Sequence, residues 1–142
     1  MHREISRWIG VCGALVLGLA AAPGGAAAQD GSDRLEANER VYTGWKYFQV
    51  YCSRCHGDNA LGSMAAPDLT YSVTEEGGVT ADSFTTVVRQ GSSSPSAAPD
   101  QRMRGFDDLL EPELIEALYL YVRARSDGSL APGRPRRART AP

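Results

Sequence analysis

The stretch Cys52-Ser53-Arg54-Cys55-His56 decides how this chain folds. It places two thiols three residues apart, with an imidazole directly after the second thiol. This spacing is typical of covalent haem attachment, in which each thiol adds to a vinyl group and the histidine ligates the iron. We therefore expect one haem c, held covalently by Cys52 and Cys55 and ligated by His56.

Three other uses of these residues fit less well. A structural zinc site normally needs four protein ligands, and beyond residue 28 the chain has no Cys or His other than Cys52, Cys55 and His56. A thioredoxin-like pair would open a helix beside a parallel sheet, whereas this pair ends a helical pattern and no sheet is predicted. A disulfide between Cys52 and Cys55 would not explain how a chain with long loops and few core residues folds.

The first 28 residues have the pattern of a secretory signal peptide. Arg3 and Arg7 precede an almost apolar run over residues 9–22, and residues 26–28 are small alanines suited to cleavage. This run of 14 residues is shorter than the roughly 20 that a membrane-spanning helix needs. We expect cleavage after Ala28, which removes Cys12 and gives a periplasmic protein without a membrane span.

The rest of the chain divides by composition. Residues 29–37 are a polar, flexible entry segment, residues 38–128 form one domain, and residues 129–142 form a tail rich in arginine, proline and glycine. We expect the tail to be mobile or to lie across the surface.

Charge is distributed unevenly along these segments. The chain after Ala28 has a net charge of −3; from Arg123 onward six arginines and one aspartate give +5, which leaves residues 29–122 at −8. A nucleic-acid-binding protein would instead cluster its basic residues on the folded surface. We therefore expect no nucleic-acid partner.

Three helices are predicted within the domain. One begins after Asn38, one after Thr80 and one at Pro112, because each position suits a helix start and is followed by apolar residues at helical spacing. Residues 57–79 are predicted to be a loop that wraps something, and no stretch is predicted to be a strand. The expected fold class is all-α, with helices and long loops around one haem.

The second axial position of the iron separates electron transfer from ligand binding. His56 is the only histidine after residue 28, so the candidates are Met64 and Met103. Met64 follows His56 by eight residues, whereas Met103 follows it by 47 and can reach the other face of the haem. Met103 also lies between two arginines, an unusual setting for a methionine that only fills a core. We predict ligation by Met103, with Met64 or an open site as alternatives.

Together these residues resemble the class I cytochromes c. The pattern Gly44-x-x-x-Phe48-x-x-x-Cys52 is similar to that family's N-terminal helix, and Leu118-x-x-Tyr121-Val122 is similar to its C-terminal helix. The resemblance implies that these two helices cross and pack at the glycine and aromatic positions.

The same resemblance implies two further site residues. Pro67, eleven residues after His56, is similar to the loop proline whose carbonyl accepts a hydrogen bond from the ligating imidazole. Met103-Arg104-Gly105-Phe106 is similar to the methionine loop, with Arg104 in place of the usual proline. Cys52, Cys55, His56, Pro67 and Met103 are thus the expected cofactor-binding residues, with His56 and Met103 on the iron.

A narrower resemblance concerns the C-terminal end. Residues 121–128, followed by Gly133-Arg134-Pro135, are similar to the end of cytochromes that accept electrons from PQQ-dependent alcohol and methanol dehydrogenases. This implies an electron carrier rather than an enzyme, which passes electrons from such a dehydrogenase toward a terminal oxidase or another cytochrome. Two alternatives stay open: a tethered cytochrome subunit of a respiratory or dehydrogenase complex, and a ligand-binding haem protein with an open sixth site.

Overall fold

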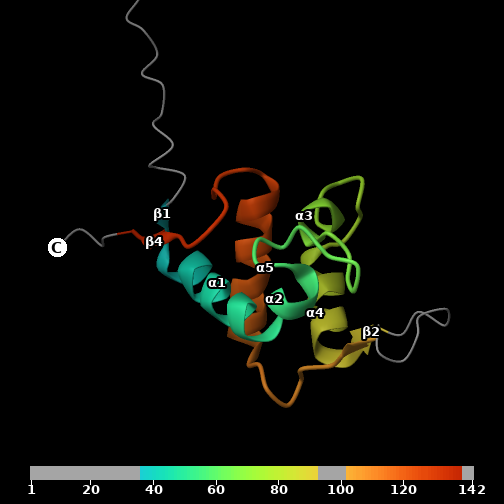
Figure 1. Ribbon diagram of the computed structural model, residues 1–142. Coiled ribbons are helices and arrows are strands. Elements are labelled where there is room, and N and C mark those ends of the chain that lie inside the picture. The colour runs from blue at the N-terminus through green and yellow to red at the C-terminus, as the bar shows by residue number, and fades with distance from the viewer. Residues whose placement is uncertain (1–35, 93–101, 139–142) are drawn as a thin grey trace, which may run out of the picture.

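The computed structural model describes residues 36–92 and 102–138, so the predicted signal peptide and most of the entry segment lie outside the described residues. Helices dominate the described part, and four strands of two residues each form two small ladders (Figure 1). None of its helices is long and apolar enough to cross a membrane. The predicted all-α class is therefore confirmed in its main feature.

The centre of the molecule is the crossing of α1 (Glu39–Tyr51) and α5 (Pro112–Ser126). Figure 1 shows α1 running across α5. At the crossing a Cβ on Gly44 would overlap the carbonyl oxygen of Ala117, so only glycine lets the two backbones approach this closely. Beside it the rings of Phe48 and Tyr121 pack with centroids 5.1 Å apart. The glycine and aromatic positions that the family resemblance implies thus form the contact.

The predicted helix starts are confirmed. The Asn38 side chain accepts a hydrogen bond from the Val41 backbone N–H at 2.9 Å and caps α1. Thr80 and Ser83 form a capping box that begins α4 (Ala81–Gln90). Pro112 occupies the first turn of α5, where its missing N–H leaves no helical hydrogen bond unmade.

The prediction of a loop over residues 57–79 is wrong at one place. It contains a short helix, α3 (Leu69–Ser72), which begins because the Asp68 carboxylate accepts hydrogen bonds from the backbone N–H groups of Thr70 and Tyr71. One turn of helix has no apolar period, so the sequence pattern did not predict it. The helix packs against α5, which it meets through the hydrogen bond from the Ser126 hydroxyl to the Thr70 carbonyl.

The small ladders join segments that are far apart in the sequence. β1 (Glu36–Ala37) pairs in parallel with β4 (Arg136–Arg137), and β2 (Gly91–Ser92) pairs antiparallel with β3 (Met103–Arg104). No strand was predicted, because two residues are too few to show the alternation of a strand.

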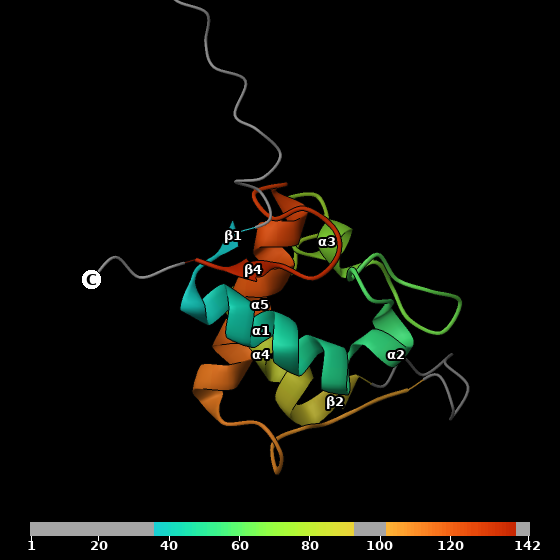
Figure 2. The same ribbon diagram turned by 60° about the vertical axis from the view of Figure 1, so that its left-hand side comes forward.

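Residues 129–138 of the predicted tail lie across the surface. Figure 2 shows this segment returning from the end of α5 to β1, at the start of α1. Leu130 is buried in the core, and the backbone N–H of Gly133 donates to Oδ1 of Asn59 at 2.7 Å. The Arg134 guanidinium lies over the Trp45 ring, and that of Arg137 lies over the Tyr42 ring. This part of the tail is therefore packed onto the domain.

Candidate haem-binding site

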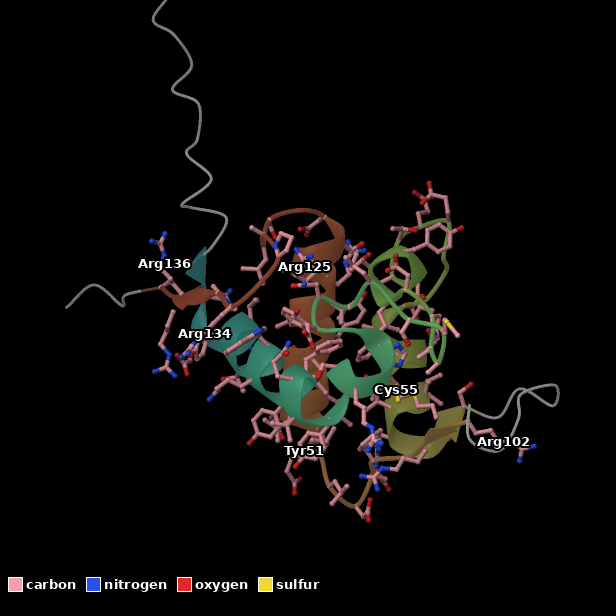
Figure 3. All side chains as sticks on the ribbon, in the orientation of Figure 1. Tyr51, Cys55, Arg102, Arg125, Arg134 and Arg136 are labelled. Carbon is pink, nitrogen blue, oxygen red and sulfur yellow. The ribbon has the colours of Figure 1, made fainter. Side chains whose placement is uncertain are left out.

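The two thiols lie where α1 ends and α2 (Ser53–His56) begins. The backbone stays helical through the motif, since the N–H groups of Cys55 and His56 both donate to the Cys52 carbonyl, at 3.1 and 2.9 Å. Cys52 is half-buried and Cys55 is exposed on α2 (Figure 3), and no disulfide joins the two. Both sulfurs are thus available for thioether bonds to one group.

The environment of Cys52 favours a thioether over a thiolate. Burial raises the pKa of the Cys52 thiol to about 12, and the neighbouring Cys55 adds to the rise. Zinc binding and disulfide exchange both use the thiolate, whereas a thioether carries no charge to desolvate. Within residues 36–92 and 102–138, moreover, no three His, Cys, Asp or Glu side chains gather as metal ligands. The site therefore fits covalent haem better than a zinc ion.

The His56 ring is buried and held in one orientation. Its exposed fraction is 7%, and its Nδ1 lies 3.0 Å from the carbonyl oxygen of Pro67. A carbonyl oxygen can only accept, so Nδ1 must carry the proton and donate it. The lone pair then lies on Nε2, the nitrogen left to bind iron.

The loop that carries Pro67 is shaped by Gly62. The Gly62 N–H donates to the His56 carbonyl at 2.9 Å. A Cβ on Gly62 would lie 2.8 Å from the carbonyl carbon of Pro67 and 2.6 Å from the nitrogen of Asp68, and the residue has a φ of +77°. Glycine here lets the loop fold back closely enough for the Pro67 carbonyl to reach the imidazole.

The turn after the motif is tied to both long helices. The Gln49 side-chain amide in α1 donates to the Asp58 carbonyl at 2.9 Å, and the Tyr121 hydroxyl in α5 approaches the same oxygen at 3.4 Å. Further along, the Ser63 hydroxyl donates to the Cys55 carbonyl at 2.5 Å. These contacts fix residues 52–63 as a unit, so the thiols and the imidazole keep their relative places.

The two candidate methionines have different surroundings. Met103 lies on β3, is partly buried and packs against the hydrophobic core. Met64 is fully exposed on the loop after the motif. Ligation of the iron by Met103 stays a prediction. Of the two methionines, Met103 is the one whose side chain is held in place by packing against the core.

Sequence reasoning missed the close backbone contacts of Gly62, Gly91 and Gly105, which shape the histidine and methionine segments. If a Cβ were added at any of these three positions, it would lie within 3 Å of backbone atoms of another segment. The only signal in the sequence is glycine itself near a predicted turn, and that does not reveal which backbone comes close.

The chain is similar to several known proteins. Residues 39–122 match the family described as "Cytochrome C oxidase, cbb3-type, subunit III". Cytochrome c-555 of Methylococcus capsulatus is 33% identical over 135 residues, which cover 93% of this chain and 94% of that protein. The chain belongs to the cytochrome c family.

Two further relatives extend this result. The c-type cytochrome XoxG from Methylobacterium extorquens AM1 has the same fold, with a TM-score of 0.61 and 25% identity over 75% of this chain and 63% of that one. Quinohemoprotein alcohol dehydrogenase ADH IIB of Pseudomonas putida is 35% identical over 89 residues, which are 63% of this chain and only 12% of that protein. This cytochrome thus matches a small part of a much longer protein.

These relatives confirm three expectations. The chain has a small c-type cytochrome fold. It binds haem c covalently, and Cys52 and Cys55 are the residues present to hold it. It is an electron-carrying c-type cytochrome.

Proposed function

We propose that this cytochrome is a periplasmic one-electron carrier that accepts electrons from a quinoprotein alcohol or methanol dehydrogenase and passes them toward a terminal oxidase. One observation carries the choice of donor. Segments similar to this chain belong to alcohol-oxidising quinoproteins: ADH IIB, and the dehydrogenase subunit of alcohol dehydrogenase (quinone) from Gluconobacter oxydans, 33% identical over 90 residues, 11% of its length. The resemblance of residues 121–135 to cytochromes that serve such enzymes supports the same class of donor.

The residues of the chain have holding and orienting roles in this proposal. Bound haem supplies a one-electron interchange between ferrous and ferric iron. Cys52 and Cys55 would hold the group covalently, His56 would present Nε2 to the iron, and Met103 would supply the second protein ligand. No substrate bond is made or broken, so the protein is a carrier and not an enzyme.

Export to the periplasm is part of the same proposal. The N-terminal pattern is that of a cleaved signal peptide. N-terminal sequencing of the protein from a periplasmic extract is expected to begin at Gln29. A chain that keeps residues 1–28 or stays in the cytoplasmic fraction would contradict export.

Charge distribution supports steered docking. Arg134, Arg136 and Arg137 are held on the surface of the domain, and Figure 3 shows Arg134 and Arg136 far from Cys55. Residues 29–122 are acidic, with a net charge of −8. A carrier whose charge is distributed this unevenly along its chain is oriented by the field of its partner before contact.

The test is reduction of the ferric holoprotein by a quinoprotein alcohol dehydrogenase of the native host, followed by stopped-flow absorption. We expect second-order reduction when alcohol is supplied, with a rate constant that changes strongly with ionic strength. Reduction by ascorbate under the same salts controls for effects on the haem itself. If the dehydrogenase fails to reduce this cytochrome while reducing another from the same host, the proposed donor is wrong.

A second function is supported by the description of the matching family as a subunit of a cbb3-type oxidase. In that case the chain would be a fixed subunit of a membrane complex. Gentle detergent extraction of native membranes separates the two functions. The mobile carrier is expected in the soluble fraction, and co-purification with an oxidase complex would favour the fixed subunit.

A further inference from the structure

The strand that carries Met103 is attached to the end of α4. β2 follows α4 directly, and its residues pair with β3 in the register Ser92 with Met103 and Gly91 with Arg104. Just beyond β3 the backbone N–H of Phe106 donates to the Val88 carbonyl of α4 at 2.9 Å. The position of Met103 therefore depends on how closely this strand approaches α4.

Two glycines set that approach from opposite sides. A Cβ on Gly91 would lie 2.5 Å from the Met103 carbonyl oxygen and 2.8 Å from the Gly105 nitrogen. A Cβ on Gly105 would overlap the Arg89 carbonyl oxygen and lie 3.0 Å from the Gln90 carbonyl carbon. The obstacles are all backbone atoms, so a methyl group at either position can be accommodated only by moving the strand and the helix end apart.

Other contacts hold the same segment but are weaker. The Arg89 Nε pairs with Asp107 Oδ1 at 2.5 Å, yet the two side chains are 48% and 62% exposed. An ion pair this exposed contributes about 1 kcal/mol or less. The ion pair therefore does not set the distance between the strand and the end of α4, whereas the two glycines determine how small that distance can be.

The segment also reaches the end of α1, next to the haem motif. Phe106 is buried, and its ring packs edge-on against Tyr51 with centroids 6.1 Å apart. Tyr51 directly precedes Cys52 in the sequence. The methionine strand is thus held both by α4 and by the helix that presents the thiols.

We propose that Gly91 and Gly105 are positioning residues for Met103, and that their close contact sets how far the thioether reaches toward the iron. The inference rests on the proposed ligation by Met103. Site geometry has to hold within about 0.5 Å for full function. A displacement large enough to admit a methyl group is therefore expected to weaken or break the iron–sulfur bond.

The test uses holoprotein carrying Gly91→Ala or Gly105→Ala. Each variant is expected to lose or shift the thioether charge-transfer band at the red end of the ferric spectrum, and its ferrous form is expected to bind carbon monoxide rapidly. Helix content by circular dichroism should stay close to that of the wild type, because the change concerns the ligand and not the helices.

Gly78→Ala is the matched control. Gly78 has a φ of +73°, close to the +84° of Gly91, but nothing lies within 4 Å of its Cβ position. The control therefore carries the same backbone strain without the close contact. Gly105 is not among the residues with positive φ, so Gly105→Ala tests the close contact without adding backbone strain.

Met103→Ala and Met64→Ala separate the failure of this inference from that of the function. We expect the first to abolish the band and the second to keep it. The opposite pattern would assign the ligand to Met64 and overturn the positioning role, while reduction by the dehydrogenase would still test the carrier function. If Met103→Ala loses the band but both glycine variants keep it, the positioning role is wrong while ligation by Met103 stands.

Failure to accumulate folded holoprotein is also informative. If one glycine variant fails, the other decides, since both act on the same contact. If both fail while Gly78→Ala folds, the glycines serve the fold and not the ligand, and the proposal is wrong.

Discussion

Nδ1 of His56 donates a hydrogen bond to the carbonyl oxygen of Pro67 across 3.0 Å, and this bond leaves Nε2 as the ring nitrogen for the proposed ligation of iron. Hydrogen bonds of this kind make a ligating imidazole more basic and fix its orientation. The acceptor is a main-chain oxygen, so with His56 in place no truncation of another side chain directly removes the bond. It can be disturbed only through the shape of the loop.

Gly62→Ala is expected to disturb it. The new methyl group would press on the Pro67 carbonyl carbon, 2.8 Å from the Cβ position, and the weaker hydrogen bond would make the imidazole a poorer donor to ferric iron. We expect a higher reduction potential, measured by spectroelectrochemical titration. Gly78→Ala, with a similar positive φ and no neighbour within 4 Å, should leave the potential unchanged. An unchanged potential in folded Gly62→Ala would contradict this role of the loop.

Leu130→Ala tests whether the tail belongs to the folded unit. Leu130 is only 1% exposed although it lies beyond the predicted end of the domain. Truncating a buried leucine lowers the free energy of unfolding by about 2–5 kcal/mol. Leu109→Ala makes the same change at a side chain that is 45% exposed and should cost far less. Equal, small losses in denaturant unfolding of the two variants would mean that residues 129–138 do not stabilise the domain.

Stability at high pH should depend on Tyr121. Burial raises the pKa of the Tyr121 phenol from 10.0 to about 12 in the folded protein. The unfolded chain therefore loses this proton first, so the stabilising contribution is complete below pH 10.0 and is lost as pH rises toward about 12. The loss is on the order of 2 kcal/mol. Unfolding free energies of Tyr121→Phe should fall less steeply over this range than those of the wild type, and parallel pH curves would contradict the assignment.

Local chemistry explains which parts of the fold the sequence predicts. Asn38 and Thr80 mark helix starts because a cap acts on backbone N–H groups within three residues. The thiols and imidazole are equally local, since one helical turn contains them all. α3 is too short to leave a period, and the packing of Leu130 depends on contacts with distant residues.

The same distinction holds at the site. Pro67 is found through its likeness to a known loop, and the structure supplies the atoms that join it to His56. The closeness of Gly91 and Gly105 to other backbone exists only after α4 and the methionine strand have come together. The sequence shows that these residues are glycines, but it does not show which backbone atoms a larger side chain would contact.

The ladder between β1 and β4 affects the order in which the parts of the chain fold. It joins Glu36 to Arg136, residues separated by 100 positions, and so closes almost the whole described chain into a ring. During the proposed export, the ladder cannot form until β4 has also crossed the membrane. The thiols of Cys52 and Cys55 emerge long before that, while the front end of α1 still lacks its partner. The proposed export therefore predicts that haem is attached to a chain whose β1–β4 ladder is still open.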